Sequence, residues 1–214
     1  MKAKIVLMVF IGMFSVNVPA QTVLSDEQLA TIEQRVLERV RDFMDCLPEI
    51  AAKGNKTAAE RENATRYIQK ALKLCIGNGN EYKYQDAYGN TRIHAPVTMQ
   101  TTSRGRANPP KPMKRYLNSL MALPYQHVEI DVCEAIRLDK KLHQVAPDSW
   151  EGSATILQVF RAETGDGLKV IDDVDKKQIT VYVNREVIDL PGGDKEEFWI
   201  VMLGDMRVAN KYNR

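Results

Sequence analysis

The stretch His127-Val-Glu-Ile-Asp-Val-Cys133, written HVEIDVC, decides how the second half of the chain is built. Its odd-numbered positions carry polar or reactive side chains, and its even-numbered positions carry valine or isoleucine. Side chains on a β-strand point alternately to opposite faces, so this period predicts a strand with one buried and one polar face. The apolar period continues through Ile136 and Leu138, and we predict a strand along residues 128–138.

The polar face of this strand could also be read as an active site. Neighbours on one face of a strand are about 6.8 Å apart, which is too far for adjacent ligands to converge on zinc at roughly 2.0–2.3 Å. Cys133 and His127 would lie about 20 Å apart along an extended strand, whereas a nucleophilic pair needs contact at about 3 Å. We therefore predict no metal site and no catalytic residue here.

Upstream of this strand the apolar residues recur every three or four positions, the period of an amphipathic helix. Ser25-Asp-Glu-Gln28 and Thr57-Ala-Ala-Glu60 both have the pattern of a helix-capping box. They predict one helix over residues 26–47, which Pro48 ends or kinks, and a second over 57–76. Together they predict a helical hairpin over residues 25–77.

The rest of the chain divides into a loop-rich segment and a sheet. Residues 78–111 are rich in Gly, Asn, Tyr and Pro, and residues 112–121 predict a short third helix. Further strands are predicted over 153–161, 178–188 and 197–208, within a mainly antiparallel sheet over 126–212. Residues 21–214 are thus predicted to form a single α+β domain, with the helices packed on one face of a curved sheet.

The first 20 residues have the pattern of an export signal. Lys2 and Lys4 precede an apolar run over residues 5–16, and the small residues Val18 and Ala20 fit cleavage after Ala20. A membrane-spanning helix needs about 20 apolar residues, more than this run provides. We predict a periplasmic or secreted protein without a membrane span after cleavage.

Charge argues against nucleic acid as a partner. The chain has 30 Lys and Arg and 28 Asp and Glu, and the two basic residues of the predicted signal account for the excess. A nucleic-acid-binding protein would need a surplus of cations. One dense basic cluster could hold a polyanion or an acidic partner, but the prolines within it favour a flexible loop that leads into a helix. The cluster consists of Arg104, Arg106, Lys111, Lys114 and Arg115.

The order of two helices, a short third helix and closing strands resembles the NTF2-like (SnoaL-like, cone-shaped) superfamily. The resemblance implies a curved sheet that wraps the helices and leaves a pocket, with Tyr67, Tyr116, Trp150 and Trp199 as candidate lining residues. Catalytic members use an acid as a base together with tyrosine donors. Glu134, the acid within the apolar stripe of 128–138, has no evident partner. Buried aromatic packing explains the four aromatic residues more simply.

The last predicted strand is apolar on both faces, because Phe198, Ile200 and Met202 alternate with Trp199, Val201 and Leu203. Such a strand is either covered on both sides within the sheet or part of a subunit interface. We predict a homodimer that uses Trp199, Val201 and Leu203.

These features together predict an exported, non-catalytic binding domain that needs no cofactor and recognises a partner protein or a small ligand. The alternatives are an isomerase- or dehydratase-type enzyme with an acid base and tyrosine donors, or an envelope scaffold that binds a polyanion.

Overall fold

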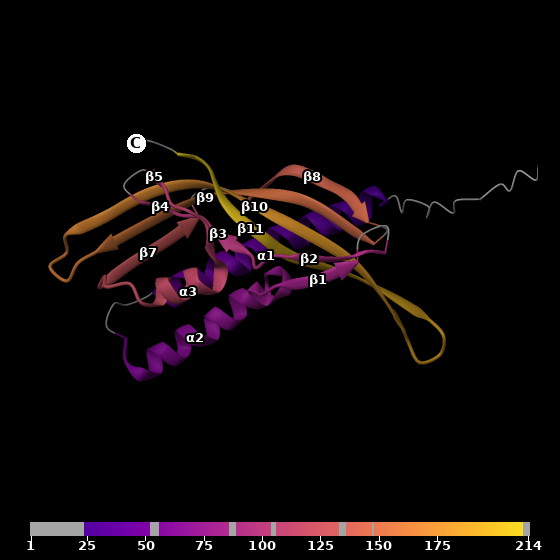
Figure 1. Ribbon diagram of the computed structural model, residues 1–214, viewed down its shortest axis with the longest axis horizontal. Coiled ribbons are helices and arrows are strands. Elements are labelled where there is room, and N and C mark those ends of the chain that lie inside the picture. Colours follow the sequence, from indigo (N-terminus) through magenta and orange to yellow (C-terminus); the bar gives the residue numbers. More distant parts are fainter. Residues whose placement is uncertain are drawn as a thin grey trace, which may run out of the picture.

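Three helices lie along one side of a long, bent sheet in the described part of the chain (Figure 1). The structure is a computed structural model that describes residues 24–51, 56–85, 89–103, 106–132, 136–146 and 148–211. The predicted α+β class, with a mainly antiparallel sheet, is confirmed. The predicted export signal lies outside the described residues, as do Arg104, Cys133 and Glu134. Within the described residues, no helix is long and apolar enough to cross a membrane.

The two long helices begin at the capping boxes that the sequence predicts. Helix α1 spans Asp26–Ala51, and the Ser25 and Gln28 side chains bond each other's backbone N–H groups. Helix α2 spans Ala58–Lys73, and Thr57 and Glu60 make the same reciprocal pair. The predicted range of 26–47 is too short, because α1 runs on to Ala51 with Pro48 inside it. Burial of Ile50 and Ala51 against the core favours this continuation.

The segment predicted as loop contains several short elements. A turn of 3-10 helix, η1, spans Ile76–Gly79, and the hairpin strands β1 and β2 span Tyr82–Gln85 and Thr91–His94. The two-residue strands that follow are β3 (Thr98–Met99), β4 (Thr102–Ser103), β5 (Arg106–Ala107) and β6 (Lys111–Pro112). Helix α3 then spans Met113–Met121, close to the predicted range.

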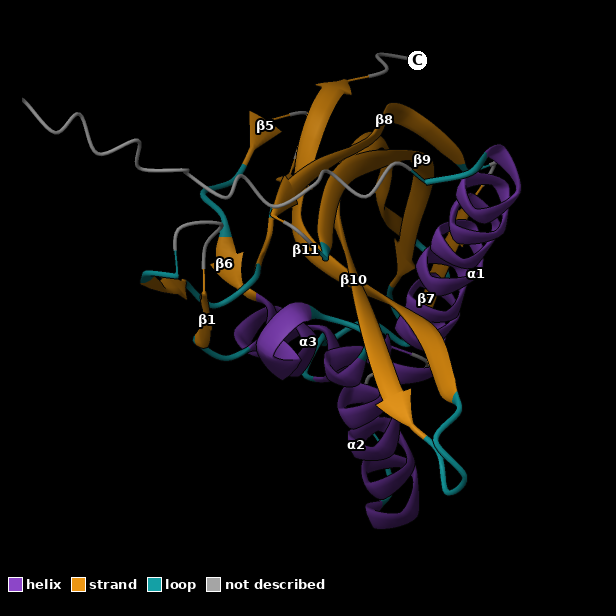
Figure 2. Cartoon of the chain, turned by 90° about the vertical axis from the view of Figure 1, so that its right-hand side faces the viewer, coloured by secondary structure: helices purple, strands orange, loops and turns teal. Residues whose placement is uncertain are grey.

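Five longer strands build most of the main sheet. They are β7 (His127–Val132), β8 (Arg137–Ala146), β9 (Ser149–Glu163), β10 (Lys169–Asp189) and β11 (Lys195–Lys211). The strand order is β6-β3-β11-β10-β9-β7, and β8 also pairs with β9. β3 runs parallel to β11, and all other pairs are antiparallel. Figure 2 shows the sheet bending around the helices.

The quoted stretch HVEIDVC forms β7 as predicted, up to Val132. Val128 and Ile130 are buried, whereas His127 and Asp131 are exposed. Glu129 accepts a 2.8 Å hydrogen bond from Arg161 Nη1 on β9. The prediction of a single strand along 128–138 is wrong, because β7 and β8 are separate strands that pair with different halves of β9.

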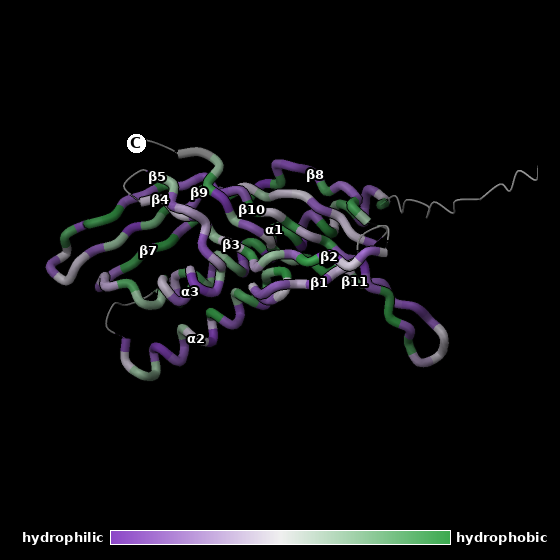
Figure 3. The backbone as a smooth tube through the Cα atoms, in the orientation of Figure 1, coloured by the Kyte–Doolittle hydropathy of each residue, from purple (hydrophilic) through white to green (hydrophobic). Residues whose placement is uncertain are grey.

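The core lies between the helices and the inner face of the sheet, and hydrophobic and hydrophilic residues follow one another along β9 and β10 (Figure 3). β11 is fixed to the helices: Arg39 Nε on α1 donates a 2.9 Å hydrogen bond to the carbonyl oxygen of Val201. Leu203 N donates a 2.9 Å bond to the carbonyl oxygen of Leu74. Val201 and Leu203 are 3% and 0% exposed, so these two predicted interface residues belong to the chain's own core and are not free to contact a second copy.

Candidate functional site

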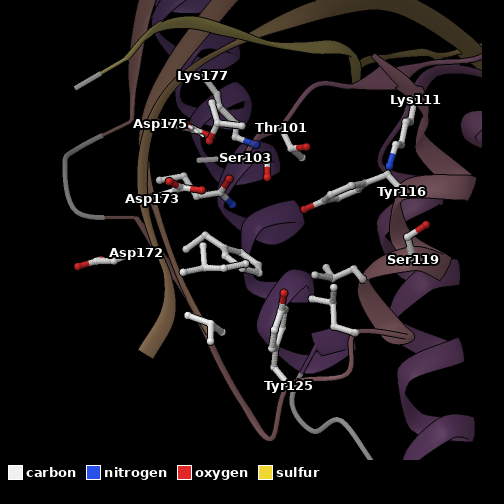
Figure 4. A pocket seen from close by; sticks show the side chains of 17 residues that line it. Thr101, Ser103, Lys111, Tyr116, Ser119, Tyr125, Asp172, Asp173, Asp175 and Lys177 are labelled. Atoms are coloured by element: carbon white, nitrogen blue, oxygen red, sulfur yellow. Dashed lines mark hydrogen bonds between the residues drawn. The ribbon is translucent and has the colours of Figure 1, made fainter. Parts of the chain in front are cut away.

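A cavity of about 720 Å³ lies between α3 and the inner face of the sheet. Its walls come from the β4 region, from α3 with the segment after it, and from β9 and β10 (Figure 4). The volume is within the range of small-molecule sites, which are typically about 300–1,000 Å³. The cavity is therefore large enough to hold a small organic molecule.

One end of the cavity is polar because two charged residues occupy inward positions on β10. The buried positions of this strand alternate through Ile179, Val181 and Val183, and Asp175 and Lys177 continue the same series. Since strand side chains alternate, these two residues face the core side and not solvent. They are 8% and 2% exposed.

Each of the two charged groups is held by a neighbour from the segment around β4. Thr102 Oγ1 lies 2.8 and 2.9 Å from the two carboxylate oxygens of Asp175 and donates its hydrogen bond to that carboxylate. Lys177 Nζ donates a 3.2 Å bond to the carbonyl oxygen of Gln100 and lies 3.7 Å from Met99 Sδ. Burial lowers the pKa of Lys177 to about 8, although the negative charge of Asp175 acts in the opposite direction. These contacts fix both groups at the cavity wall.

Tyr116 reaches the cavity from α3. Met113, Leu117 and Leu120 bury one side of this helix, which leaves the partly buried Tyr116 at the cavity wall. Its hydroxyl points across the cavity toward the side that carries Asp175 and Lys177 (Figure 4). Burial, and to a smaller extent the charge of Asp175, raises the pKa of Tyr116, so the phenol stays protonated and can donate a hydrogen bond.

The other part of the wall is mainly apolar. The Tyr125 hydroxyl also points into the cavity there (Figure 4). The apolar lining consists of Leu120, Leu123, Phe160, Val170 and Ile171. A ligand with a polar end and an apolar body would thus meet matching surfaces at both ends.

The charges that line the cavity come in both signs. Asp173 and Asp175 contribute negative charge. Lys177, and Lys111 at the α3 side, contribute positive charge. Asp172 borders the cavity but points away from it (Figure 4). Its carboxylate accepts hydrogen bonds from Lys169 Nζ at 2.8 Å and from Arg161 Nε at 3.3 Å. Both bonds lower the pKa of Asp172, and the bond from Lys169 has the larger effect. A wall with both signs of charge lacks the single-sign field that would select a strongly anionic or strongly cationic ligand.

The structure brings one of the four predicted pocket residues, Tyr116, to this cavity. Tyr67, Trp150 and Trp199 do not belong to its lining. Trp150 and Trp199 instead pack edge to face, with ring centroids 5.1 Å apart. This supports the packing interpretation for the two tryptophans.

The described members of the predicted basic cluster are exposed and lie between β5 and the first turn of α3. They are Arg106, Lys111, Lys114 and Arg115. Lys111 also lines the cavity. The cluster therefore forms an outer surface beside the cavity, separate from its buried polar end.

Sequence reasoning missed Asp175 and Lys177. The sequence predicts this strand only over residues 178–188, so both residues fall before its expected start. The strand in fact begins at Lys169. The signal that would have found both residues is the alternation along the strand. Asp175 and Lys177 are separated from Ile179, Val181 and Val183 by even numbers of residues, so they belong to the same buried face.

Within the described residues, no group of three or more His, Cys, Asp or Glu side chains is arranged to hold a metal ion. Comparisons of the chain with protein-family models, with curated proteins and with solved structures found no match.

Proposed function

We propose that this chain is a binding protein for a small, uncharged organic molecule, which it holds in the cavity between α3 and β10. The observation that carries the proposal is the division of the cavity wall into a buried polar end and an apolar part. The polar end offers both a hydrogen-bond donor, Tyr116, and an acceptor, Asp175. Sites of this kind are mostly apolar, with a few fixed polar groups that orient the ligand.

We further infer an NTF2-like form for the domain. The bent, mainly antiparallel sheet, the three helices on its inner side and the cavity between α3 and the sheet support this inference. In such a form the ligand would enter at the wide end of the sheet, next to the hairpin between β9 and β10. An experimental structure in which the sheet is flat, with the cavity filled by side chains, would contradict it.

An isomerase-type enzyme is the second candidate, because Tyr116 and Asp175 line the same cavity. An acid positioned as a base opposite a phenol donor is the arrangement that proton abstraction beside a carbonyl requires. Loss of deuterium from a trial ketone labelled beside its carbonyl, at a rate that Asp175→Asn abolishes, would favour the enzyme over a binding protein.

A larger side chain at the mouth of the cavity is expected to weaken the binding of a small neutral ligand. Val170 lines the cavity and is 49% exposed, so Val170→Trp adds bulk at the entrance without a change in the buried core. Extra side-chain volume in a space that the ligand fills costs about 1–3 kcal/mol, which corresponds to a rise in Kd of roughly five- to 150-fold. The measurement is a fluorescence titration with Nile red, a neutral dye whose emission reports the polarity around it.

Leu168→Trp provides the matched control for this titration. Leu168 is two residues away, 64% exposed and outside the cavity lining. Its substitution should leave the dye Kd unchanged. Equal Kd values for the wild type and both variants would mean that the dye binds elsewhere, and absence of saturable binding would argue against the proposed function.

We also propose that residues 1–20 direct export. The basic start, the short apolar run and the small residues before Gln21 support this assignment. Amino-terminal sequencing of the protein from a host with a signal peptidase should begin at Gln21. Retention of Met1 would contradict the proposal.

A further inference from the structure

Lys177 is an amine that lines the polar end of the cavity from a buried position. Its side chain is 2% exposed, yet it belongs to the cavity lining. Nζ is held 3.2 Å from the carbonyl oxygen of Gln100, so the amine has a fixed place at the wall. A surface lysine, by comparison, is solvated and mobile. This position gives Lys177 a chemical property that an exposed lysine lacks.

That property is access to the neutral, nucleophilic form near physiological pH. Burial disfavours the ammonium ion, and the pKa of Lys177 falls to about 8. At pH 8 the Lys177 amine is then neutral in about half of the molecules, whereas a free lysine at this pH is almost fully protonated. Desolvated lysines of this kind react with carbonyl compounds to form imines.

The cavity also supplies the groups that imine formation needs around the amine. The Tyr116 hydroxyl points toward the side of the cavity that carries Lys177 (Figure 4), and its raised pKa keeps it a proton donor. Asp175 lies on the same inward face of β10, with its carboxylate bonded to Thr102. The apolar lining provides a place for the body of the reacting molecule.

We propose that Lys177 binds an aldehyde or ketone ligand covalently and reversibly, as an imine, in the cavity between α3 and β10. This inference rests on the proposed binding function and names the chemical class of its ligand. A carbonyl compound is uncharged, in keeping with the mixed charges of the wall, and it presents its polar group at one end.

The reaction balances without an oxidant, a reductant or a metal. The Nζ lone pair attacks the carbonyl carbon, and the carbonyl oxygen takes a proton from the Tyr116 hydroxyl. The new ammonium nitrogen returns one proton to Tyr116, which leaves a neutral carbinolamine. Tyr116 then protonates the carbinolamine hydroxyl, the C–O bond breaks and water leaves. Loss of the remaining N–H proton to the tyrosinate gives the imine, and hydrolysis reverses each step.

Reductive trapping tests the proposal. The mature protein is incubated with 6-methoxy-2-naphthaldehyde at a concentration near that of the protein, and sodium borohydride then converts any imine to a stable secondary amine. Peptide mass mapping should place most of the label on Lys177. The labelling rate should rise between pH 7 and pH 9, because the neutral amine is the reacting form.

Two lysine variants and a control define the outcome. Lys177→Met and Lys177→Arg should each lower labelling at least about tenfold, in line with loss of the nucleophile. Lys176→Met, at the neighbouring position with opposite parity on β10, should label like the wild type. Label spread evenly over exposed lysines in the wild type would overturn the proposal. If Nile red binds but Lys177 is not labelled, the imine proposal is wrong and the proposed binding site stands. If Nile red does not bind and Lys177 is not labelled, both proposals fail.

Discussion

Replacing Phe43 with alanine is expected to lower the free energy of unfolding by about 3–5 kcal/mol. Phe43 lies on α1, is 0% exposed and belongs to the core between the helices and the sheet. The substitution removes the apolar contacts of a whole ring and leaves a cavity that the neighbouring helices and strands can close only in part. This is the largest single effect that we expect.

Urea denaturation followed by circular dichroism measures this loss. Asp45→Ala is the matched control, because Asp45 lies within the same two turns of α1 but is exposed. It should change the free energy of unfolding by no more than about 0.5 kcal/mol. A loss below about 1 kcal/mol for Phe43→Ala would mean that α1 does not pack on the sheet in the way described.

Lys177→Met is expected to make stability less dependent on pH in the alkaline range. The pKa of Lys177 falls from 10.5 to about 8 in the folded chain. Below pH 8 the amine is protonated in both states, and the folded state carries the cost of burying the charge. Between pH 8 and 10.5 the folded chain has released the proton and the unfolded chain still holds it, so the stability contributed by Lys177 rises with pH.

The size of this contribution follows from the shift in pKa. One pKa unit corresponds to about 1.4 kcal/mol, so the wild type should gain about 3 kcal/mol relative to Lys177→Met between pH 8 and 10.5. The variant should be the more stable protein at pH 7, and its advantage should shrink over this interval. Lys177→Met also loses the hydrogen bond to the Gln100 carbonyl oxygen. This loss lowers the free energy of unfolding of the variant by the same amount at every pH, so it does not change how stability varies with pH.

Urea denaturation of both proteins at intervals between pH 7 and 10.5 gives the difference directly. Burial also raises the pKa of Cys75, to about 12, but this contribution is common to both proteins and cancels. Lys176→Met should follow the wild type at every pH. A stability difference between Lys177→Met and wild type that stays constant with pH would show that the Lys177 amine is not buried as a charge.

The residues that could be predicted from the sequence are those whose local pattern agrees with their tertiary surroundings. The two capping boxes at Ser25 and Thr57 and the alternation in HVEIDVC are of this kind, and the structure confirms them. In each case a short stretch contains both the polar and the apolar signals that set the local geometry. The start of each helix and the buried face of β7 follow from these signals.

The misreadings arose where packing between distant segments decides the outcome. Pro48 carries a local signal to end the helix, and burial of Ile50 overrides it. The two apolar faces of β11 fitted either a subunit interface or an inner strand. The position of β11 between β3 and β10, under α1, buries Val201 and Leu203.

The cavity was out of reach of sequence reasoning for the same reason. Tyr116 on α3 and Asp175 on β10 line the same cavity because α3 lies on the inner side of the bent sheet. Their approach depends on the curvature of the sheet, which no short motif encodes. Charged residues at inward positions of a long strand, such as Lys177, are the local signal that remains available.

A crystal structure of the protein with Nile red bound tests most directly whether this cavity is the binding site. The account predicts density for the dye between α3 and β10, with its carbonyl oxygen within hydrogen-bond distance, about 3 Å, of Tyr116 or Lys177 and its rings against Phe160 and Leu120. Dye bound on another surface, with the space between α3 and β10 closed by side chains, would contradict it.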